Sequence, residues 1–309
     1  MNCSKTPDLV LLGLSRDPEQ WEFFFCLFLA LYLLSLLGNL LLLLTIGTDS
    51  HLHTPMYFFL GQLSLVDVCF TSTTAPKMLQ TLWTSNGAIS FSDCLMQLYF
   101  FAVFADMDSL LLTVMAIDHY AAICHPLRYP ILMTPCRCGL LVAASWGVAH
   151  SISLIHTLLL SQLFFYPNQE IPHFFCDLGP LLWLSCSDAN LNEDLVVALT
   201  GFLGISPLLC IISSYACVFH AVAMVPSAQG KKKALATCTS HLCTVILFYS
   251  TVFVAYLKPP STSRSPGEMV AAVMYTLVTP TLNPFIYSLR NKDVKSSLKM
   301  ILGIESSQD

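Results

Sequence analysis

Three neighbouring residues, Asp118, His119 and Tyr120, have side chains that could perform chemistry. An acid beside a histidine could form a catalytic pair, contribute to a metal site, or mark the polar end of a helix that has reached water. Consecutive residues on a helix point about 100° apart, which is poor geometry for a proton relay between Asp118 and His119. The sequence also lacks the motifs of common hydrolases and of phosphate-binding loops. It does not indicate an enzyme.

Two other groups of residues could bind a metal ion, and neither has suitable spacing. Cys124 and His125 are followed by Cys136 and Cys138 at uneven intervals, and His51 and His53 form an isolated pair. Structural metal sites use more regular ligand spacing. We therefore expect no bound metal from these groups, and we expect no organic cofactor.

The composition identifies the elements that must position these residues. Of the 309 residues, 55% are hydrophobic and only 11% are charged, whereas soluble domains carry about 25% charged residues. The apolar residues fall into blocks of about 20 residues, the length of helix that crosses a bilayer. These blocks lie near 24–47, 56–78, 95–118, 139–160, 196–222, 237–257 and 269–288. The sequence predicts an all-α membrane protein with seven transmembrane helices at 24–288.

The distribution of Lys and Arg predicts the orientation, because cytoplasmic loops carry the excess of these residues. One side of the membrane receives nine of the fourteen: Arg128, Arg137, Lys231, Lys232, Lys233, Arg290, Lys292, Lys295 and Lys299. We therefore expect an extracellular N-terminus at 1–23 and a cytoplasmic segment at 289–309 with a short amphipathic eighth helix. Asn2, in Asn-Cys-Ser, would then be a glycosylation acceptor on the extracellular side.

Ionisable residues at mid-membrane depth are costly and suggest function. Asp67 lies about halfway along the second span, and Asp106 and Asp108 lie within the third. Asp67 and Asp108 could be neutral, hydrogen-bonded core acids. They could instead join Asn39 and Asn283 in an oxygen-rich site for Na⁺ or a shared proton. Asp106 lies about 200° around the helix from Asp108, so we expect it to face elsewhere, toward a ligand.

Seven motifs, in order along the chain, carry a family resemblance. They are GN (38–39), LHTPMYFFL (52–60), LSLVDVCF (63–70), PKML (76–79), MAIDHYAAICHPLRY (115–129), KALATCTSHL (233–242) and PTLNPFIYSLRNKDVK (280–295). The chain resembles the olfactory receptors, which belong to the rhodopsin-like G-protein-coupled receptors. The resemblance implies a plasma-membrane receptor with an odorant pocket in the outer half of the bundle. It also implies coupling to a heterotrimeric stimulatory G protein that raises cyclic AMP, and no nucleic-acid partner.

The resemblance assigns roles to individual residues. It implies a disulfide between Cys94 and Cys176. The residues expected to serve activation and G-protein coupling are Asp118, His119, Tyr120, Tyr215, Tyr249, Asn283, Pro284 and Tyr287. For the ligand pocket, helical spacing places Phe101, Ala105 and Asp106 on one wall. The other spans are expected to contribute Phe202, Val252, Phe253, Tyr256 and Thr276. We expect small, mostly apolar ligands rather than cationic amines.

The chain departs from the family pattern at two positions. Tyr166 stands where the family commonly has a cysteine, so Cys186 is expected to be free or joined to Cys3. His119 stands where the family has arginine, and a histidine is shorter and mostly neutral at cytoplasmic pH. The leading interpretation is an odorant receptor, and the alternative is an odorant-binding receptor that couples weakly because of His119. A transporter or channel is a remote alternative, because the two halves show no internal repeat.

Overall fold

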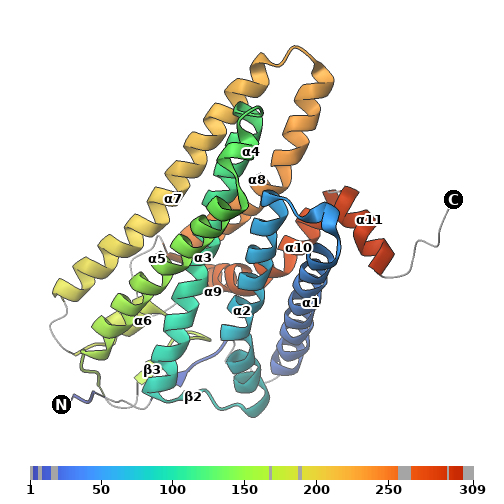
Figure 1. The fold of residues 1–309 in the computed structure, drawn as a ribbon. Coiled ribbons are helices and arrows are strands. Elements are labelled where there is room, and N and C mark those ends of the chain that lie inside the picture. Colours follow the sequence, from blue (N-terminus) through green and yellow to red (C-terminus); the bar gives the residue numbers. More distant parts are fainter. Residues whose placement is uncertain are drawn as a thin grey trace.

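Helices lying side by side form the body of the molecule in the computed structural model, which describes residues 3–5, 9–14, 20–166, 169–186, 190–256, 266–290 and 292–301 (Figure 1). The long helices are α1 (Trp21–Thr48), α2 (Pro55–Thr84), α3 (Phe91–Cys124), α5 (Pro135–Ser161), α7 (Asn190–Met224) and α8 (Ala228–Tyr256). The last span is composed of α9 (Pro266–Val273), η3 (Met274–Val278) and α10 (Thr279–Arg290). Together they form a seven-helix membrane bundle, and each apolar block of the sequence lies mainly within one of these spans.

The bundle has its polar residues inside and apolar residues on its outer surface. On α1, Leu33, Leu37 and Leu44 are exposed, whereas Asn39 and Thr45 are fully buried. This arrangement suits a helix whose outer face meets lipid and whose inner face meets other helices. Within the described residues, six helical segments are long and apolar enough to cross a membrane. The thirty-residue α2 is less apolar, and much of its surface is buried.

Proline and a π-helical segment interrupt the spans. Pro207 lies inside α7 and Pro284 inside α10. The five residues of η3 form a π-helix directly before α10. Proline removes a backbone hydrogen bond, and π-helical turns are frequent at functional sites. The seventh span therefore has backbone irregularities on both sides of Pro280.

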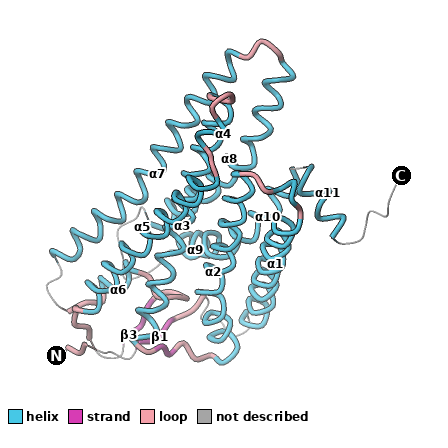
Figure 2. The backbone as a smooth tube through the Cα atoms, viewed as in Figure 1, coloured by secondary structure: helices cyan, strands magenta, loops and turns pink. Residues whose placement is uncertain are grey.

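A small sheet covers one end of the bundle, which we call the sheet end. Its strands are β1 (Leu9–Leu11), β2 (Ala88–Ile89) and β3 (Gln169–Ile171), in the order β2-β1-β3. Strand β1 pairs antiparallel with β2 and parallel with β3. At Gly87 a side-chain carbon would lie 2.0 Å from the carbonyl oxygen of Leu11, so only glycine fits there. Figure 2 shows the strands at the same end of the bundle as the N-terminus, among loops, with helices forming the rest of the bundle.

Three short helices lie between spans, namely η2 (Ser50–Leu52), α4 (Tyr129–Leu132) and α6 (Leu178–Trp183), and α11 (Lys292–Ile301) follows the last span. Helices α3 and α5 begin at Ser90 and Thr134, whose side chains accept hydrogen bonds from the backbone N–H groups three residues later, as capping residues do. Helix α4 and the connection between α7 and α8 lie at the end opposite the sheet, which we call the α4 end (Figure 1).

Candidate functional site

An aromatic cluster fills the bundle near the sheet end. Its members are Phe70, Phe101, Phe175, Phe248 and Tyr275, which come from α2, α3, the loop before α6, α8 and η3. The Tyr275 ring centroid lies 5.2 Å from that of Phe70, 5.6 Å from Phe248 and 6.1 Å from Phe101. Phe175 from the loop lies 4.6 Å from Phe101. These contacts bring α2, α3, α8 and the loop before α6, which covers the cluster, together around Tyr275 of η3.

Several predicted ligand residues surround this aromatic cluster. Phe101 is a member, and Ala105, Val252 and Phe253 are half-buried side chains that pack against the larger apolar core to which the aromatic cluster belongs. Asp106 is also half-buried. The predicted wall on α3 therefore consists of one buried ring and two half-buried side chains, one of which is an acid.

Two predicted ligand residues have polar partners in the protein. Tyr256 donates a hydrogen bond from its hydroxyl to Asp177 Oδ1 at 3.4 Å, which links α8 to the loop before α6. Thr276 is fully buried, and its hydroxyl donates to the Ala272 carbonyl at 2.8 Å. The hydroxyl proton of Thr276 is thus used within its own helix.

Phe202 does not face the bundle interior. Its side chain is 63% exposed, and it belongs to an exposed stripe on α7 that continues through Ile205, Leu209 and Ile212. Its neighbour Leu203 is only 6% exposed. The prediction that Phe202 lines the pocket was wrong, because this face of α7 is directed away from the other helices.

The loop that covers the aromatic cluster is fixed to the helices below it. Cys176 is bonded to Cys94 at the start of α3, as the family resemblance implied. The side chain of Gln97 adds two hydrogen bonds, because it accepts from Cys176 N at 2.9 Å and donates to Thr73 O at 3.0 Å. A second disulfide joins Cys186 to Cys3, so the second of the two expected states for Cys186 is present.

The mid-membrane polar residues form a partly satisfied group. Asn283 Nδ2 donates to both carboxyl oxygens of Asp67, at 3.2 and 2.9 Å. Asn39 Nδ2 donates to the carbonyls of Ser35 and Pro280, each at 3.0 Å. The Asp108 side chain is also buried, on the neighbouring helix α3. Three buried oxygens have no hydrogen-bond partner, namely Asn39 Oδ1, Asp108 Oδ1 and Asn283 Oδ1.

A chain of hydrogen bonds joins three helices toward the α4 end. His119 Nδ1 lies 3.0 Å from the Tyr215 hydroxyl, which lies 2.8 Å from His241 Nδ1. His241 Nε2 lies 2.9 Å from the Leu112 carbonyl. A carbonyl only accepts, so His241 Nε2 must carry a proton, and in the neutral ring Nδ1 accepts from Tyr215. Tyr215 oxygen then accepts from His119 Nδ1–H. This His119–Tyr215–His241 chain links α3, α7 and α8.

The three adjacent residues Asp118, His119 and Tyr120 have three separate partners. Asp118 accepts a hydrogen bond from the Tyr129 hydroxyl at 2.8 Å, whereas Tyr120 contacts His125 at 3.1 Å. Burial of Tyr129, together with the nearby Asp118 carboxylate, raises the pKa of the Tyr129 hydroxyl. No hydrogen bond joins Asp118 to His119 in the part of the chain that the structure describes.

The remaining coupling residues lie along α8 and α10. The Tyr249 hydroxyl lies 2.9 Å from Ser109 Oγ and joins α8 to α3. Pro284 interrupts α10 one residue after Asn283, and Tyr287 is buried within the bundle.

Two residues of these clusters, His241 and Tyr275, were not selected individually from the sequence. His241 lies inside the quoted motif KALATCTSHL, and Tyr275 directly precedes the selected Thr276.

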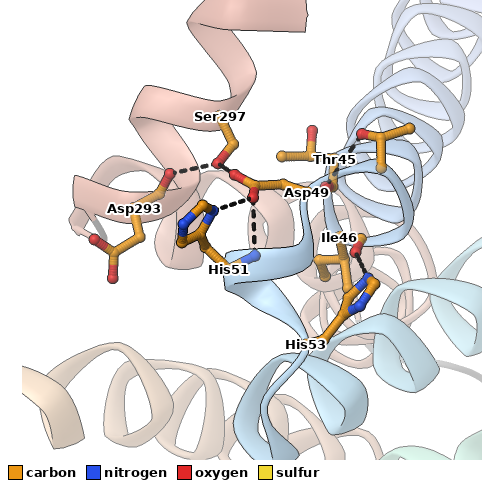
Figure 3. Close-up of polar contacts among 8 residues, drawn as sticks. Thr45, Ile46, Asp49, His51, His53, Asp293 and Ser297 are labelled. Atoms are coloured by element: carbon orange, nitrogen blue, oxygen red, sulfur yellow. Dashed lines mark hydrogen bonds and ion pairs between the residues drawn. The ribbon is translucent and has the colours of Figure 1, made fainter.

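A second polar junction joins the α1–α2 connection to α11 (Figure 3). Asp49 accepts from His51 N at 2.9 Å and from the hydroxyl of Ser297, and it contacts His51 Nδ1 at 3.0 Å. These contacts lower the pKa of Asp49, and the Ser297 hydrogen bond is the largest cause. His53 contacts a different acceptor, the carbonyl of Ile46, at 3.1 Å. Within the described residues, no group of three or more His, Cys, Asp or Glu side chains is placed to hold a metal.

Comparison with known proteins gives matches along nearly the whole chain. A family model described as "Olfactory receptor" matches residues 25–304. Olfactory receptor 1G1 of Gorilla gorilla gorilla is 51% identical over 303 residues, which is 98% of this chain and 97% of the relative. Olfactory receptor 1M1 of Mus musculus is 51% identical over 301 residues, covering 97% of this chain and 96% of the relative. Olfactory receptor 7D2 of Homo sapiens is 52% identical over 300 residues, with the same two shares.

Proposed function

Because this chain belongs to the olfactory receptor family of G-protein-coupled receptors, we propose that it binds small, mostly apolar volatile molecules at the sheet-end aromatic cluster. The sheet end then faces outside and the α4 end faces the cytoplasm. The excess of Lys and Arg near the α4 end and on α11 supports this orientation. Binding activates a stimulatory G protein at the cytoplasmic end and raises cyclic AMP.

One observation supports coupling between ligand binding and G-protein activation above the others. Helix α8 contributes residues both to the aromatic cluster and to the His119–Tyr215–His241 chain. Near the sheet end it contributes Phe248 to the aromatic cluster and Tyr256 to the covering loop. About two turns from Phe248 and about four turns from Tyr256, it contributes His241 to the hydrogen-bond chain. A ligand that displaces the part of α8 near the sheet end therefore acts on the same rigid helix that closes the cytoplasmic end. Such a ligand shifts the population toward an open packing by its differential affinity.

The chemistry of the aromatic cluster indicates the class of ligand. Aromatic rings favour apolar and aromatic ligands through burial and ring packing. The polar groups at its margin, Asp106 and Tyr256, can orient a hydroxyl or carbonyl group. Phe175 and Phe101 are in direct contact, so a ligand enters by separating the covering loop from α3.

The mid-membrane polar group fits a bound sodium ion or a shared proton. Asn283 is hydrogen-bonded to Asp67, and one buried oxygen in each of Asn39, Asp108 and Asn283 lacks a hydrogen-bond partner. Oxygen ligands of this kind suit hard cations, and a cation would offset the repulsion between Asp67 and Asp108. We propose that Asp67, Asp108, Asn39 and Asn283 hold this ion or proton when the bundle is closed.

A screen of volatile compounds tests the proposed function. Cells expressing the receptor should raise cyclic AMP in response to a subset of apolar volatiles. For each active compound, Phe101→Leu should shift the concentration response, because Phe101 belongs to the aromatic cluster. Phe202→Leu is the matched control, because this equally large side chain is 63% exposed on α7. Equal shifts from both variants would place the ligand elsewhere.

A second candidate function is a receptor that binds odorants but couples weakly. The observation that favours it is the position of His119, whose ring is buried and bonded to Tyr215 in the closed packing. A long arginine would be able to reach a partner outside the bundle, whereas this histidine is held inside. Odorant binding without a comparable rise in cyclic AMP, measured on purified and cell-expressed receptor, would identify this behaviour.

A further inference from the structure

An apolar cavity at the α4 end takes no part in the functions proposed above. It has a volume of about 430 Å³ and lies between α3, α4 and the beginning of α5. Its walls are Ile117, Tyr120, Ala121, Leu132, Met133, Arg137, Leu140 and Leu141. Volumes of about 300–1,000 Å³ are typical of sites for small ligands and cofactors. The cavity is therefore large enough for part of an organic molecule.

The cavity opens toward the hydrocarbon rather than into the bundle. Met133 on its inner side is 6% exposed, whereas Leu140 is 64% exposed and Leu132 is 37% exposed. The exposed leucines lie on the outer surface of a membrane helix and of the neighbouring short helix. A flexible acyl chain from the bilayer can enter such a cavity without leaving an apolar environment.

One cationic side chain completes the cavity. Arg137 is exposed, and its Nη1 donates a hydrogen bond to the Ile131 carbonyl at 2.7 Å, which holds the guanidinium beside α4. No acid lies in the first turn of α5, and within the described residues no carboxylate forms an ion pair with Arg137. A guanidinium has five N–H donors, so most of them remain available to an anion. The site thus pairs an uncompensated positive charge with an apolar cavity.

We propose that this cavity binds an anionic phospholipid of the cytoplasmic leaflet, with its headgroup at Arg137 and an acyl chain along Ile117, Leu140 and Leu141. The phosphate accepts hydrogen bonds from the guanidinium, a geometry that arginine favours. Anionic lipids concentrate in the cytoplasmic leaflet. The choice of leaflet rests on the orientation proposed above, but the chemistry of the site does not.

The bound lipid would lie against the segment that holds Asp118. The cavity contacts Leu132 in α4, and the same four-residue helix begins at Tyr129, which donates to Asp118. Tyr120, which neighbours His119, forms part of the wall. An occupied cavity therefore secures α4 and favours the packing in which the Tyr129–Asp118 hydrogen bond is made.

Photolabelling of the full-length receptor in nanodiscs tests this proposal. The probe is phosphatidylserine with a photoreactive acyl chain, compared with phosphatidylcholine and a free fatty acid that carry the same chain. Peptide mapping should find label in 117–121 and 137–141, several-fold more from phosphatidylserine than from either comparison lipid. Both leaflets of a nanodisc contain the probe, so the result does not depend on the proposed orientation or on odorant binding.

Matched variants identify the contribution of each part of the site. Arg137→Gln should reduce the labelling several-fold, and Arg137→Lys should retain most of it. Arg128→Gln is the charge control, because Arg128 is an exposed cation of the same connection that does not line the cavity. Leu140→Trp should block the acyl chain, whereas Leu158→Trp, on an exposed part of the same helix, should not. Thermal unfolding of each variant verifies that it is folded.

Three results would overturn the proposal. Equal labelling by phosphatidylcholine would show that the cavity accepts neutral lipids without using Arg137. Equal labelling by the fatty acid would show that the phospholipid headgroup is not recognised. Labelling that Arg137→Gln and Leu140→Trp leave unchanged would place the lipid outside the cavity.

Discussion

Replacing Tyr215 by phenylalanine removes one oxygen atom from the centre of the His119–Tyr215–His241 chain. That hydroxyl donates to His241 Nδ1 at 2.8 Å and accepts from His119 Nδ1 at 3.0 Å. The phenyl ring retains the size and apolar contacts of the tyrosine, so the closed packing loses these two hydrogen bonds and a contact with the Cys238 thiol. If α8 separates from α3 on activation, the open packing lacks these bonds already and is unaffected.

The expected magnitude follows from the two lost bonds. Each buried hydrogen bond contributes about 0.5–1.5 kcal/mol net, and unpartnered imidazole nitrogens left in the interior increase the loss. Tyr215→Phe should therefore favour the open packing by about 1–3 kcal/mol, which corresponds to about 5–150-fold in the closed-to-open ratio. We expect a marked rise in signalling without odorant.

The assay is basal cyclic AMP in cells, compared at matched surface expression of each receptor. Tyr99→Phe is a closely matched control, because it also removes a tyrosine hydroxyl bonded to a histidine, His150, at 2.8 Å. That bond joins α3 to α5 and does not involve α8. Basal activity that is unchanged by Tyr215→Phe, or raised equally by both variants, would refute the role assigned to the chain.

Other perturbations test the remaining parts of the molecule. His119→Arg should raise the maximal odorant response several-fold, because a charge-assisted hydrogen bond to the G protein is worth about 1.5–3 kcal/mol; an equal maximal response would make His119 a tolerated variant. Cys94→Ser should abolish surface expression, whereas Cys186→Ser, which releases only the N-terminal segment, should be mild; equal losses measured by flow cytometry would contradict this ranking. Asp106→Ala or Tyr256→Phe should shift odorant potency by about tenfold or more if they orient a ligand hydroxyl or carbonyl, and unchanged potency in both would remove them from the site. The Ser297 hydrogen bond lowers the pKa of Asp49. The stability that this bond gives to the docking of α11 is therefore complete above the ordinary carboxyl pKa and is lost only as pH falls through the lowered pKa. Hydrogen exchange in α11 should therefore rise in Asp49→Asn but show no loss of the Ser297 contact between about pH 5 and pH 8; such a loss in the natural sequence would refute the assignment.

The seven spans could be predicted from sequence because crossing a bilayer imposes a length and an apolar composition on each helix. The apolar composition of a span does not indicate which face of the helix points into the bundle. Phe202 and Leu203 are equally apolar, yet the first is 63% exposed and the second only 6%. In water, polarity separates inside from outside, but in lipid both faces of α7 can be apolar. Hydropathy therefore placed the helix correctly and Phe202 incorrectly.

The loops were less predictable for a different reason. Strands β1, β2 and β3 have two or three residues each, which is too short for an alternating pattern to appear. The Cys3–Cys186 bond was one of two alternatives, because the position of the family's usual partner cysteine is Tyr166 in this chain. Tyr166 explains why the usual partner is missing, but only the position of the N-terminal segment shows that Cys3 takes its place. The polar chain through His241 similarly depends on three helices meeting at one depth.

The small sheet has a consequence for the order in which the receptor is made. Its central strand β1 comes first in the chain, but its neighbours lie at 88–89 and 169–171. During synthesis, the four spans α1, α2, α3 and α5 must be made before β3 exists. The Cys3–Cys186 bond requires still more chain. The residues of β1 and Cys3 are thus made early but secured late, and a misinserted span would leave both without their partners.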